Sequence, residues 1–300
     1  MSKKILITGS NGLLGQKLVS LLKNDHQLLA TSTGQNIIND KSNYSYSSLD
    51  ITDAKSVELL FHSFKPDVVI NTAAMTNVDG CEDEKNKCFD INVKAVQTLA
   101  DLCQDSNAHL IHISTDFIFD GQDGPYKEDD LANPLSYYGK SKYESELVLD
   151  ESKANWTILR TIILYGTADN LKRNNIVLWG RKALKDGQSL NIIDDQFRSP
   201  TLAEDLAQAC RLALEKNAFG IFNVSGKDIM SIFEMVERMA DFYKCDKSNI
   251  NKISSDTLNQ KAKRPPKTGF VLDKAIKELG YQPHSFEQGL QILENQLIKE

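Results

Sequence analysis

Lys4-Ile5-Leu6-Ile7-Thr8-Gly9-Ser10-Asn11-Gly12-Leu13-Leu14-Gly15 is the stretch that decides the fold of this chain. Its apolar start predicts a short buried strand, and apolar residues then recur at helical spacing as far as Leu22. The three glycines allow, in order, a tight turn, a close approach of backbone to a diphosphate, and close packing of helix on sheet. Strand, glycine turn and helix in succession predict a dinucleotide site at the helix N-terminus. The alternative is a tight turn that binds nothing.

The first half of the chain repeats this alternation. Strands are predicted at Lys4–Thr8, Gln27–Thr31, Tyr44–Leu49, Asp67–Asn71, His109–Ser114 and Trp156–Arg160. Helices are predicted at residues 12–23, 53–64, 85–105 and 135–149. Several strands are apolar throughout, as expected of strands buried on both faces. The repeated β-α units predict an α/β fold with a Rossmann-type, doubly wound parallel sheet.

The second half is richer in loops. Helices are predicted there at residues 174–185, 202–215, 230–243 and 285–298. We expect residues 1–165 to form a dinucleotide-binding domain. We expect residues 166–300 to form mainly a smaller substrate-binding lobe, with some segments returning to the sheet.

Composition restricts the class of protein. The net charge of −6 argues against nucleic acid as a partner, and no apolar run approaches the roughly 20 residues of a membrane span. Five cysteines without a C-x-x-C pair are typical of reduced thiols, so we expect a cytoplasmic protein. We expect it to be a monomer or a homodimer. The histidines form no zinc-ligand pattern, and no metal site is predicted. His109 and His112, on one predicted strand, are expected in the core or at a sheet edge.

Ligands of doubly wound sheets bind beyond the C-terminal ends of the strands. The second predicted strand ends in Ser32 and neighbours that carry no acid. A carboxylate there would bind the ribose of NAD and repel a 2′-phosphate, so its absence favours NADPH, with NADH the alternative. Asp50 is expected at the adenine edge, its alternative role being an ordinary helix cap.

Tyr138-Gly139-Lys140-Ser141-Lys142 carries the predicted catalytic chemistry. Tyr138 and Lys142 are four residues apart and lie on one face of a helix. A lysine ammonium near a phenol lowers its pKa from about 10, which makes a proton donor near neutral pH. The pattern alone is weak, because a chain of this composition contains it by chance on the order of once.

These residues together carry a family resemblance. The Thr8-Gly9-x-x-Gly12-x-x-Gly15 turn, a hydroxyl after the fifth strand and Tyr138-x-x-x-Lys142 resemble the extended short-chain dehydrogenases/reductases. Longer motifs resemble the dTDP-4-dehydrorhamnose reductases in order and spacing. They are Thr76-Asn77-Val78-Asp79-Gly80-Cys81-Glu82, Ser114-Thr115-Asp116-Phe117-Ile118-Phe119-Asp120-Gly121, Arg160-Thr161 with Tyr165-Gly166, Asp195-Gln196-Phe197 with Ser199-Pro200-Thr201, and Arg264-Pro265-Pro266.

The resemblance implies reduction of the C4 keto group of a nucleotide-activated 6-deoxy sugar, dTDP-4-dehydrorhamnose above all, in deoxysugar and polysaccharide synthesis. It makes Tyr138 the proton donor, Lys142 the ligand of the nicotinamide ribose, and Thr115 the hydrogen-bond donor to the reacting oxygen. The expected cofactor contacts are Gly9, Ser10, Asn11, Gly12, Leu13, Leu14, Gly15, Ser32, Asp50, Ile51, Ala73, Ala74, Thr76, Tyr138 and Lys142. The expected substrate contacts are Thr76, Val78, Asp116, Phe117, Gln196, Arg198 and Arg264. Some relatives use Mg²⁺ at a dimer contact, and no residue here identifies its ligands.

Departures from the family pattern leave alternatives. Ile162-Ile163-Leu164 stands where the family has Ser-Trp-Val, and Arg198 replaces a small residue. One alternative is an epimerase or dehydratase of the same superfamily, although Phe117 occupies the place of the dehydratase acid. The other is a non-catalytic, NADP-binding regulatory subunit like the β subunit of methionine adenosyltransferase, which can retain the same motifs.

Overall fold

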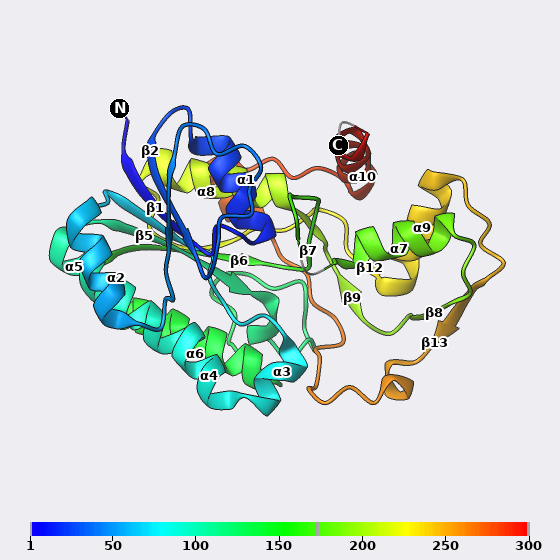
Figure 1. Cartoon of the computed structure of the whole chain (residues 1–300). Coiled ribbons are helices and arrows are strands. Elements are labelled where there is room, and N and C mark those ends of the chain that lie inside the picture. The colour runs from blue at the N-terminus through cyan, green and yellow to red at the C-terminus, as the bar shows by residue number, and fades with distance from the viewer. Residues whose placement is uncertain (1, 172–173, 299–300) are drawn as a thin grey trace.

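A parallel sheet of seven strands forms the centre of the larger lobe in the computed structural model, which describes residues 2–171 and 174–298 (Figure 1). Residues 172–173 and 299–300 of the predicted second lobe lie outside the described residues. The strands, in spatial order, are β11 (Gly220–Asn223), β6 (Asn155–Thr161), β5 (His109–Thr115), β4 (Val68–Asn71), β1 (Lys4–Thr8), β2 (Gln27–Ser32) and β3 (Ser45–Ser48). The order reverses between β1 and β4, which is the switch point where ligands of doubly wound sheets bind. The predicted fold class is confirmed.

Helices cover both faces of this sheet (Figure 1). They are α1 (Leu13–Leu22) and α8 (Ala203–Lys216) on one face, and α2 (Ala54–Phe64), α5 (Ala95–Ser106) and α6 (Tyr137–Glu151) on the other. Ile5 and Ile7 of β1 pack in the core under α1 and α8, whereas Leu6 packs in the core under α2 and α5. This double burial explains why the strand sequences are apolar without alternation.

The helix predicted at residues 85–105 is interrupted. It consists of α4 (Lys85–Phe89), a π-helical turn η1 (Asp90–Lys94) and α5. The π turn brings Asn92 into the protein, 1% exposed, where its side chain bonds the Met75 backbone. A short helix before it, α3 (Val78–Asp83), and the strand β11 have no counterpart among the sequence predictions.

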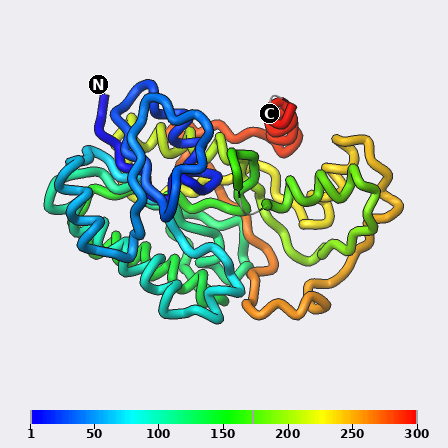
Figure 2. Tube along the Cα trace, viewed as in Figure 1, coloured from blue at the N-terminus to red at the C-terminus, as the bar shows by residue number. Residues whose placement is uncertain are grey.

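A second hydrophobic core lies in the smaller lobe. It is built by α7 (Ile176–Lys185), α9 (Ile232–Tyr243), α10 (Phe286–Leu297) and the pair β8 (Leu190–Ile193) and β13 (Ile250–Ile253). Figure 2 shows the segments before and after α8 side by side in this lobe. The remaining elements are β7 (Leu164–Tyr165) with β10 (Thr201–Leu202), β9 (Phe197–Arg198) with β12 (Met230–Ser231), η2 (Asp116–Ile118), η3 (Ser255–Leu258) and η4 (Ala275–Leu279).

Segments from the second half also complete the first lobe, since α8 and β11 pack on and extend the main sheet. A domain boundary at residue 165 stays a prediction. Within residues 2–171 and 174–298, no helix has the length and apolar character needed to cross a membrane.

Candidate active site

The glycine turn has the geometry of a phosphate-binding loop. Gly9 has a φ of +68°, and its carbonyl oxygen accepts a hydrogen bond from the Gly12 N–H at 2.9 Å. A Cβ on Gly15 would lie only 2.4 Å from the same oxygen. Gly12 caps α1 without a side-chain bond, and the first turn of α1 holds no acid, so the helix N-terminus is suited to an anion. Ser10 Oγ is buried and has no hydrogen-bond partner among the described residues, which fits a site that a phosphate completes.

A tyrosine from the neighbouring strand orders the end of β2. The Tyr46 hydroxyl lies 3.1 Å from the Ser32 carbonyl oxygen and 2.8 Å from that of Gly34. The Asn11 side chain donates to the Gln35 carbonyl oxygen at 2.9 Å, so this predicted cofactor residue also fixes the loop after β2. The loop therefore has a defined shape beside the position expected for the adenosine ribose.

Asp50 bonds within its own turn. Its carboxylate accepts hydrogen bonds from the Thr52 N–H at 2.9 Å and the Thr52 hydroxyl at 2.7 Å. The cap of α2 is Asp53, whose side chain accepts from the Ser56 N–H, so the alternative role of Asp50 as the helix cap is wrong. Contacts of Asp50 and Ile51 with adenine stay a prediction.

Tyr138 and Thr115 meet at the C-terminal edge of the sheet. Ser136 caps α6 by accepting a hydrogen bond from the Gly139 N–H at 3.2 Å, which places Tyr138 in the first turn. The Tyr138 ring lies edge-on to Phe117, with 5.7 Å between ring centroids. Burial raises the pKa of the Tyr138 hydroxyl, and its hydrogen bond with Thr115 opposes that rise. The predicted donor and its hydroxyl partner are thus brought together.

Lys142 has a neighbour that the sequence did not predict. Its Nζ lies 2.8 Å from Nε2 of His112, and the lysine is 2% exposed. Burial lowers the pKa of Lys142 to about 8, against the opposing effects of Glu146 and Cys88. The prediction that Lys142 lowers the pKa of Tyr138 is wrong in this structure, because burial of the phenol outweighs the effects that favour the phenolate.

A buried asparagine supports this side of the site. Asn92 accepts from the Met75 N–H at 2.8 Å, and its Nδ2 donates to the Met75 carbonyl oxygen at 3.1 Å and to Ser141 Oγ at 2.9 Å. It therefore ties α6 to the loop after β4, which contains the predicted cofactor residues Ala73, Ala74 and Thr76. Asn92 was missed because only the π turn brings it inward, and no spacing in the sequence marks that turn.

The Arg198 side chain is buried and forms an ion pair inside the protein. Its Nε lies 3.7 Å from Oδ2 of Asp116, and both side chains are 2% exposed. The guanidinium also donates to the carbonyl oxygens of Phe197 and Pro265, at 2.7 and 2.6 Å. Thr268 donates to the same carboxylate oxygen of Asp116 at 2.5 Å. The Arg198 guanidinium, predicted to contact the substrate, is thus buried in a junction of three chain segments.

Arg264 is also paired within the chain. Its Nη2 lies 2.8 Å from the Asp79 carboxylate, which also accepts from the Ala262 N–H at 3.0 Å. This contact joins the loop of Arg264 to α3, whose first residue is the predicted substrate contact Val78. Gln196 is 7% exposed, next to β9. The predicted substrate residues therefore come from segments that converge beside η2, and their contacts with substrate stay predictions.

Arg198→Met is expected to lower the free energy of unfolding by about 3–5 kcal/mol at neutral pH, because Asp116 would be left buried without its counter-charge. Burial already raises the pKa of Asp116, and loss of Arg198 would raise it further. A carboxyl with a raised folded-state pKa is stabilising when protonated, and that stability is lost as pH rises through the folded-state pKa. The loss of unfolding free energy in Arg198→Met should therefore become smaller as the pH falls towards about 4. Urea unfolding at several pH values measures this loss.

Arg211→Met provides the matched control. Arg211 lies on α8 at the surface, where it pairs with Glu215 of the same helix and with Asp25 after α1. Its loss should cost about 1 kcal/mol or less. The double variant Arg198→Met/Asp116→Asn should recover part of the lost stability. An Arg198→Met protein as stable as wild type at neutral pH would contradict the ion pair.

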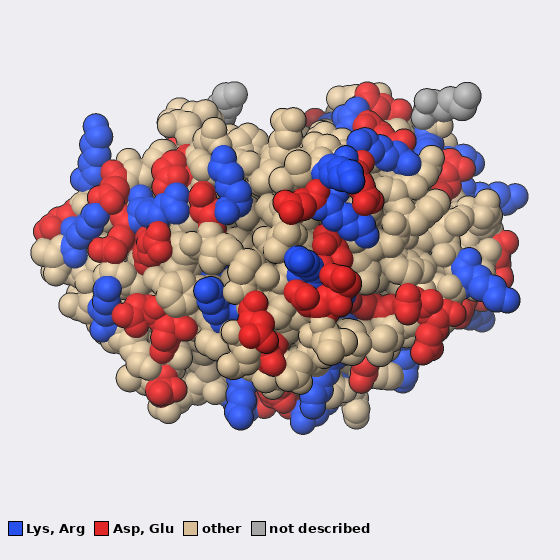
Figure 3. Space-filling model, turned by 180° about the vertical axis from the view of Figure 1, so that it is seen from behind, with Lys and Arg blue, Asp and Glu red and all other residues tan. Residues whose placement is uncertain are grey.

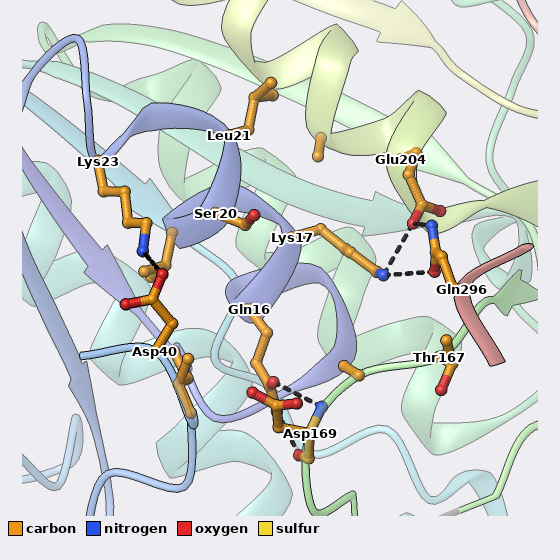
Figure 4. A pocket seen from close by; sticks show the side chains of 14 residues that line it. Gln16, Lys17, Ser20, Leu21, Lys23, Asp40, Thr167, Asp169, Glu204 and Gln296 are labelled. Atoms are coloured by element: carbon orange, nitrogen blue, oxygen red, sulfur yellow. Dashed lines mark hydrogen bonds and ion pairs between the residues drawn. The ribbon is translucent and has the colours of Figure 1, made fainter. Parts of the chain in front are cut away.

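A cavity lies elsewhere, on the outer side of α1. It measures about 590 Å³ and contains none of the predicted site residues. Its charged groups are paired, with Lys17 Nζ at 2.8 Å from Glu204 and Lys23 bonded to Asp40 (Figure 4). This cavity is therefore separate from the predicted site residues.

The surface carries charges of both signs. The face opposite to that of Figure 1 carries acidic and basic side chains interspersed (Figure 3). Across the part of the chain that the structure describes, no three His, Cys, Asp or Glu side chains are arranged to hold a metal ion.

Comparison with known proteins adds independent evidence. The family model described as the RmlD substrate binding domain matches residues 3–298. A dTDP-4-dehydrorhamnose reductase of Aggregatibacter actinomycetemcomitans is 32% identical, over 96% of this chain and 97% of its own. Methionine adenosyltransferase 2 subunit beta of Bos taurus is 30% identical, over 86% and 77%. A dTDP-4-dehydrorhamnose reductase from Bacillus anthracis, solved in complex with NADP, superposes with a TM-score of 0.84 and 26% identity, covering 99% of this chain and 100% of the other.

Proposed function

This chain belongs to the RmlD substrate binding domain family, and from that membership and the site we propose that it is an NADPH-dependent reductase of dTDP-4-dehydrorhamnose. The product is dTDP-rhamnose, a precursor for deoxysugar-containing polysaccharides. One observation carries the proposal. The side chains of Tyr138, in the first turn of α6, and Thr115, at the end of β5, meet at the sheet edge where the cofactor of this fold binds.

The residues divide the chemistry in a simple way. The cofactor, when bound, supplies the hydride that reduces C4. Tyr138 donates its proton to the C4 oxygen as negative charge develops there, and Thr115 donates a hydrogen bond to the same oxygen. The phenol of Tyr138 is protonated at neutral pH, as a proton donor must be, although burial raises its pKa and so makes it a weaker acid. Lys142 is assigned to the nicotinamide ribose, the role that the family resemblance implies for it.

The cofactor site fits a phosphorylated dinucleotide. The turn at Gly9–Gly15 and the buried hydroxyl of Ser10 suit the diphosphate, and the end of β2 carries no carboxylate. A second buried hydroxyl, Ser114 Oγ, has no hydrogen-bond partner among the described residues and lies beside Thr115. We therefore expect NADPH to be preferred over NADH.

Ser32→Asp tests this preference. A carboxylate at the end of β2 would repel a 2′-phosphate, so we expect the Kd of NADPH to rise about tenfold or more while that of NADH changes little or falls. Titration of nicotinamide fluorescence gives both values. Ser42→Asp is the control, because Ser42 is exposed in the loop after β2. Unchanged NADPH affinity in Ser32→Asp would place the 2′-phosphate at another residue.

The substrate is tested directly. Purified protein, NADPH and enzymatically prepared dTDP-4-dehydrorhamnose should give loss of nicotinamide absorbance and formation of dTDP-rhamnose, identified by mass and by hydrolysis to the free sugar. No turnover with this sugar, but turnover with another nucleotide-linked 4-keto sugar, would reassign the substrate and leave the reaction class in place.

A regulatory subunit is the second candidate, because subunits of methionine adenosyltransferase match 86% of this chain at a similar identity. Co-purification of the tagged protein with a methionine adenosyltransferase catalytic subunit, together with no sugar reduction, would favour it. We further propose that the protein is cytoplasmic, since its five cysteines are all free thiols. We also propose that it acts as a monomer or homodimer.

A further inference from the structure

A row of polar side chains crosses the centre of the sheet behind Lys142. Thr8 on β1, Asn71 on β4 and His112 on β5 are neighbours in register. Thr8 Oγ1 lies 2.6 Å from Asn71 Oδ1, and Asn71 Nδ2 lies 3.1 Å from His112 Nδ1. All three are 2% exposed or less. The row ends at α6, where His112 Nε2 lies 2.8 Å from the Nζ of Lys142.

Buried polar groups in the middle of a sheet are costly unless each of them is satisfied. Simple packing would favour an apolar residue at position 112, as at its strand neighbours Leu110 and Ile111. The histidine instead meets the one lysine that the proposed mechanism uses. Its ring is further held by Ser145, whose Oγ lies 3.0 Å from Nε2.

From this geometry we propose that His112 is the positioning residue of Lys142, holding its amine beside β5 and stabilising the charged form. The inference rests on the proposed function only for the use of Lys142 in reduction. The contact between His112 and Lys142 is independent of the substrate.

The bonds allow two proton arrangements. A neutral imidazole has one donor and one acceptor nitrogen. In the first arrangement the proton is on Nδ1, which donates to the Asn71 amide oxygen, and Nε2 accepts a hydrogen bond from the Lys142 ammonium. In the second arrangement the proton is on Nε2, which donates to an uncharged Lys142 amine, and Nδ1 accepts a hydrogen bond from Asn71 Nδ2. The tautomer of His112 therefore reports the charge of Lys142.

The surrounding charges favour a neutral imidazole. Burial, and next the charge of Lys142, hold the pKa of His112 well below its ordinary value. Lys142 itself is faced by Glu146 on α6, Cys88 on α4 and the imidazole on β5. An acceptor at Nε2 favours the ammonium, so its removal should lower the pKa of Lys142 below about 8.

Two substitutions of similar size separate positioning from packing. In His112→Gln the side-chain amide can reach the place of Nε2 and accept from Lys142. In His112→Asn the shorter amide reaches only the place of Nδ1. We expect the basic limb of the pH profiles of kcat and of NADPH affinity to move to lower pH by about one unit in His112→Asn, and to stay close to wild type in His112→Gln.

A measurement without cofactor or substrate completes the test. In long-range ¹H–¹⁵N spectra of the wild-type protein, the His112 signals should change from the Nδ1–H to the Nε2–H tautomer at the pH where Lys142 loses its proton. Lys142→Met should abolish that change. This readout stays valid if the sugar proves wrong, so failure of the proposed function and failure of the inference are distinguishable.

Three results would overturn the inference. The first is an unchanged pH profile in His112→Asn with only a lower melting temperature, which marks a purely structural histidine. The second is a His112 tautomer that does not respond to pH in the wild-type protein. The third is an equal shift in the Gln and Asn variants, because only one of them retains an acceptor for Lys142.

Discussion

Tyr138→Phe should reduce kcat by about 10²–10⁴-fold while the Kd of NADPH changes little. The substitution removes one oxygen, and the ring keeps its edge-on contact with Phe117 at 5.7 Å between centroids. Stability should change little, because the buried Thr115 hydroxyl keeps its own hydrogen bonds, donating to Asp116 Oδ1 at 3.1 Å and accepting from the Phe117 N–H at 3.3 Å. The loss therefore measures proton donation rather than folding. Stopped-flow absorbance with dTDP-4-dehydrorhamnose gives kcat, and fluorescence titration gives the Kd.

Tyr137→Phe is the matched control in the same helical turn. Tyr137 is half-buried and its ring meets the Lys85 ammonium at 5.4 Å, away from the Thr115 hydroxyl. The kcat of Tyr137→Phe should stay within about twofold of wild type, since substitutions away from special contacts have small effects. Equal rates for Tyr138→Phe and wild type would remove Tyr138 from the mechanism, whatever the sugar.

Helices and strands could be predicted from the sequence where a local pattern of residues identifies the element. The run Val68-Val69-Ile70 is apolar because both faces of β4 are buried, and that burial needs no knowledge of the partner. The glycine turn was readable for the same reason, because a φ of +68° at Gly9 is a requirement of the local backbone. The strand β11 was missed because its four residues, Gly220–Asn223, are too few to show a period.

The site was only partly readable, because its remaining features depend on distant partners. Tyr138 and Lys142 could be placed on one helix face by their spacing. The partner of Lys142 is a histidine 30 residues away on another element, and Arg198 meets Pro265, 67 residues later. No spacing predicts such contacts. A charged residue that replaces a small one in a motif can bind a ligand or form a buried ion pair. The structure shows the buried pair of Arg198 with Asp116, and a contact of Arg198 with substrate stays a prediction.

Gly15→Ala should weaken NADPH binding by tenfold or more and lower the free energy of unfolding by about 1–3 kcal/mol. A Cβ at this position would lie 2.4 Å from the Gly9 carbonyl oxygen and 2.5 Å from the Ser10 Cα. Both are backbone atoms of the turn and cannot rotate away, so α1 must move off the strand. The N–H groups at the start of α1 move with it, away from the diphosphate position.

Helix propensity acts in the opposite direction, which sharpens the test. Alanine in place of glycine inside an exposed helix gains about 1 kcal/mol, so a purely local view predicts that Gly15→Ala is stabilising. Overpacking against fixed backbone costs as much or more, and we expect it to win. Ser20→Ala, on the exposed side of α1, is the control and should change stability by about 0.5 kcal/mol or less. Urea unfolding and NADPH titration decide between the two views: a Gly15→Ala protein that is more stable and still binds NADPH as wild type would show that α1 can carry the diphosphate without this close contact.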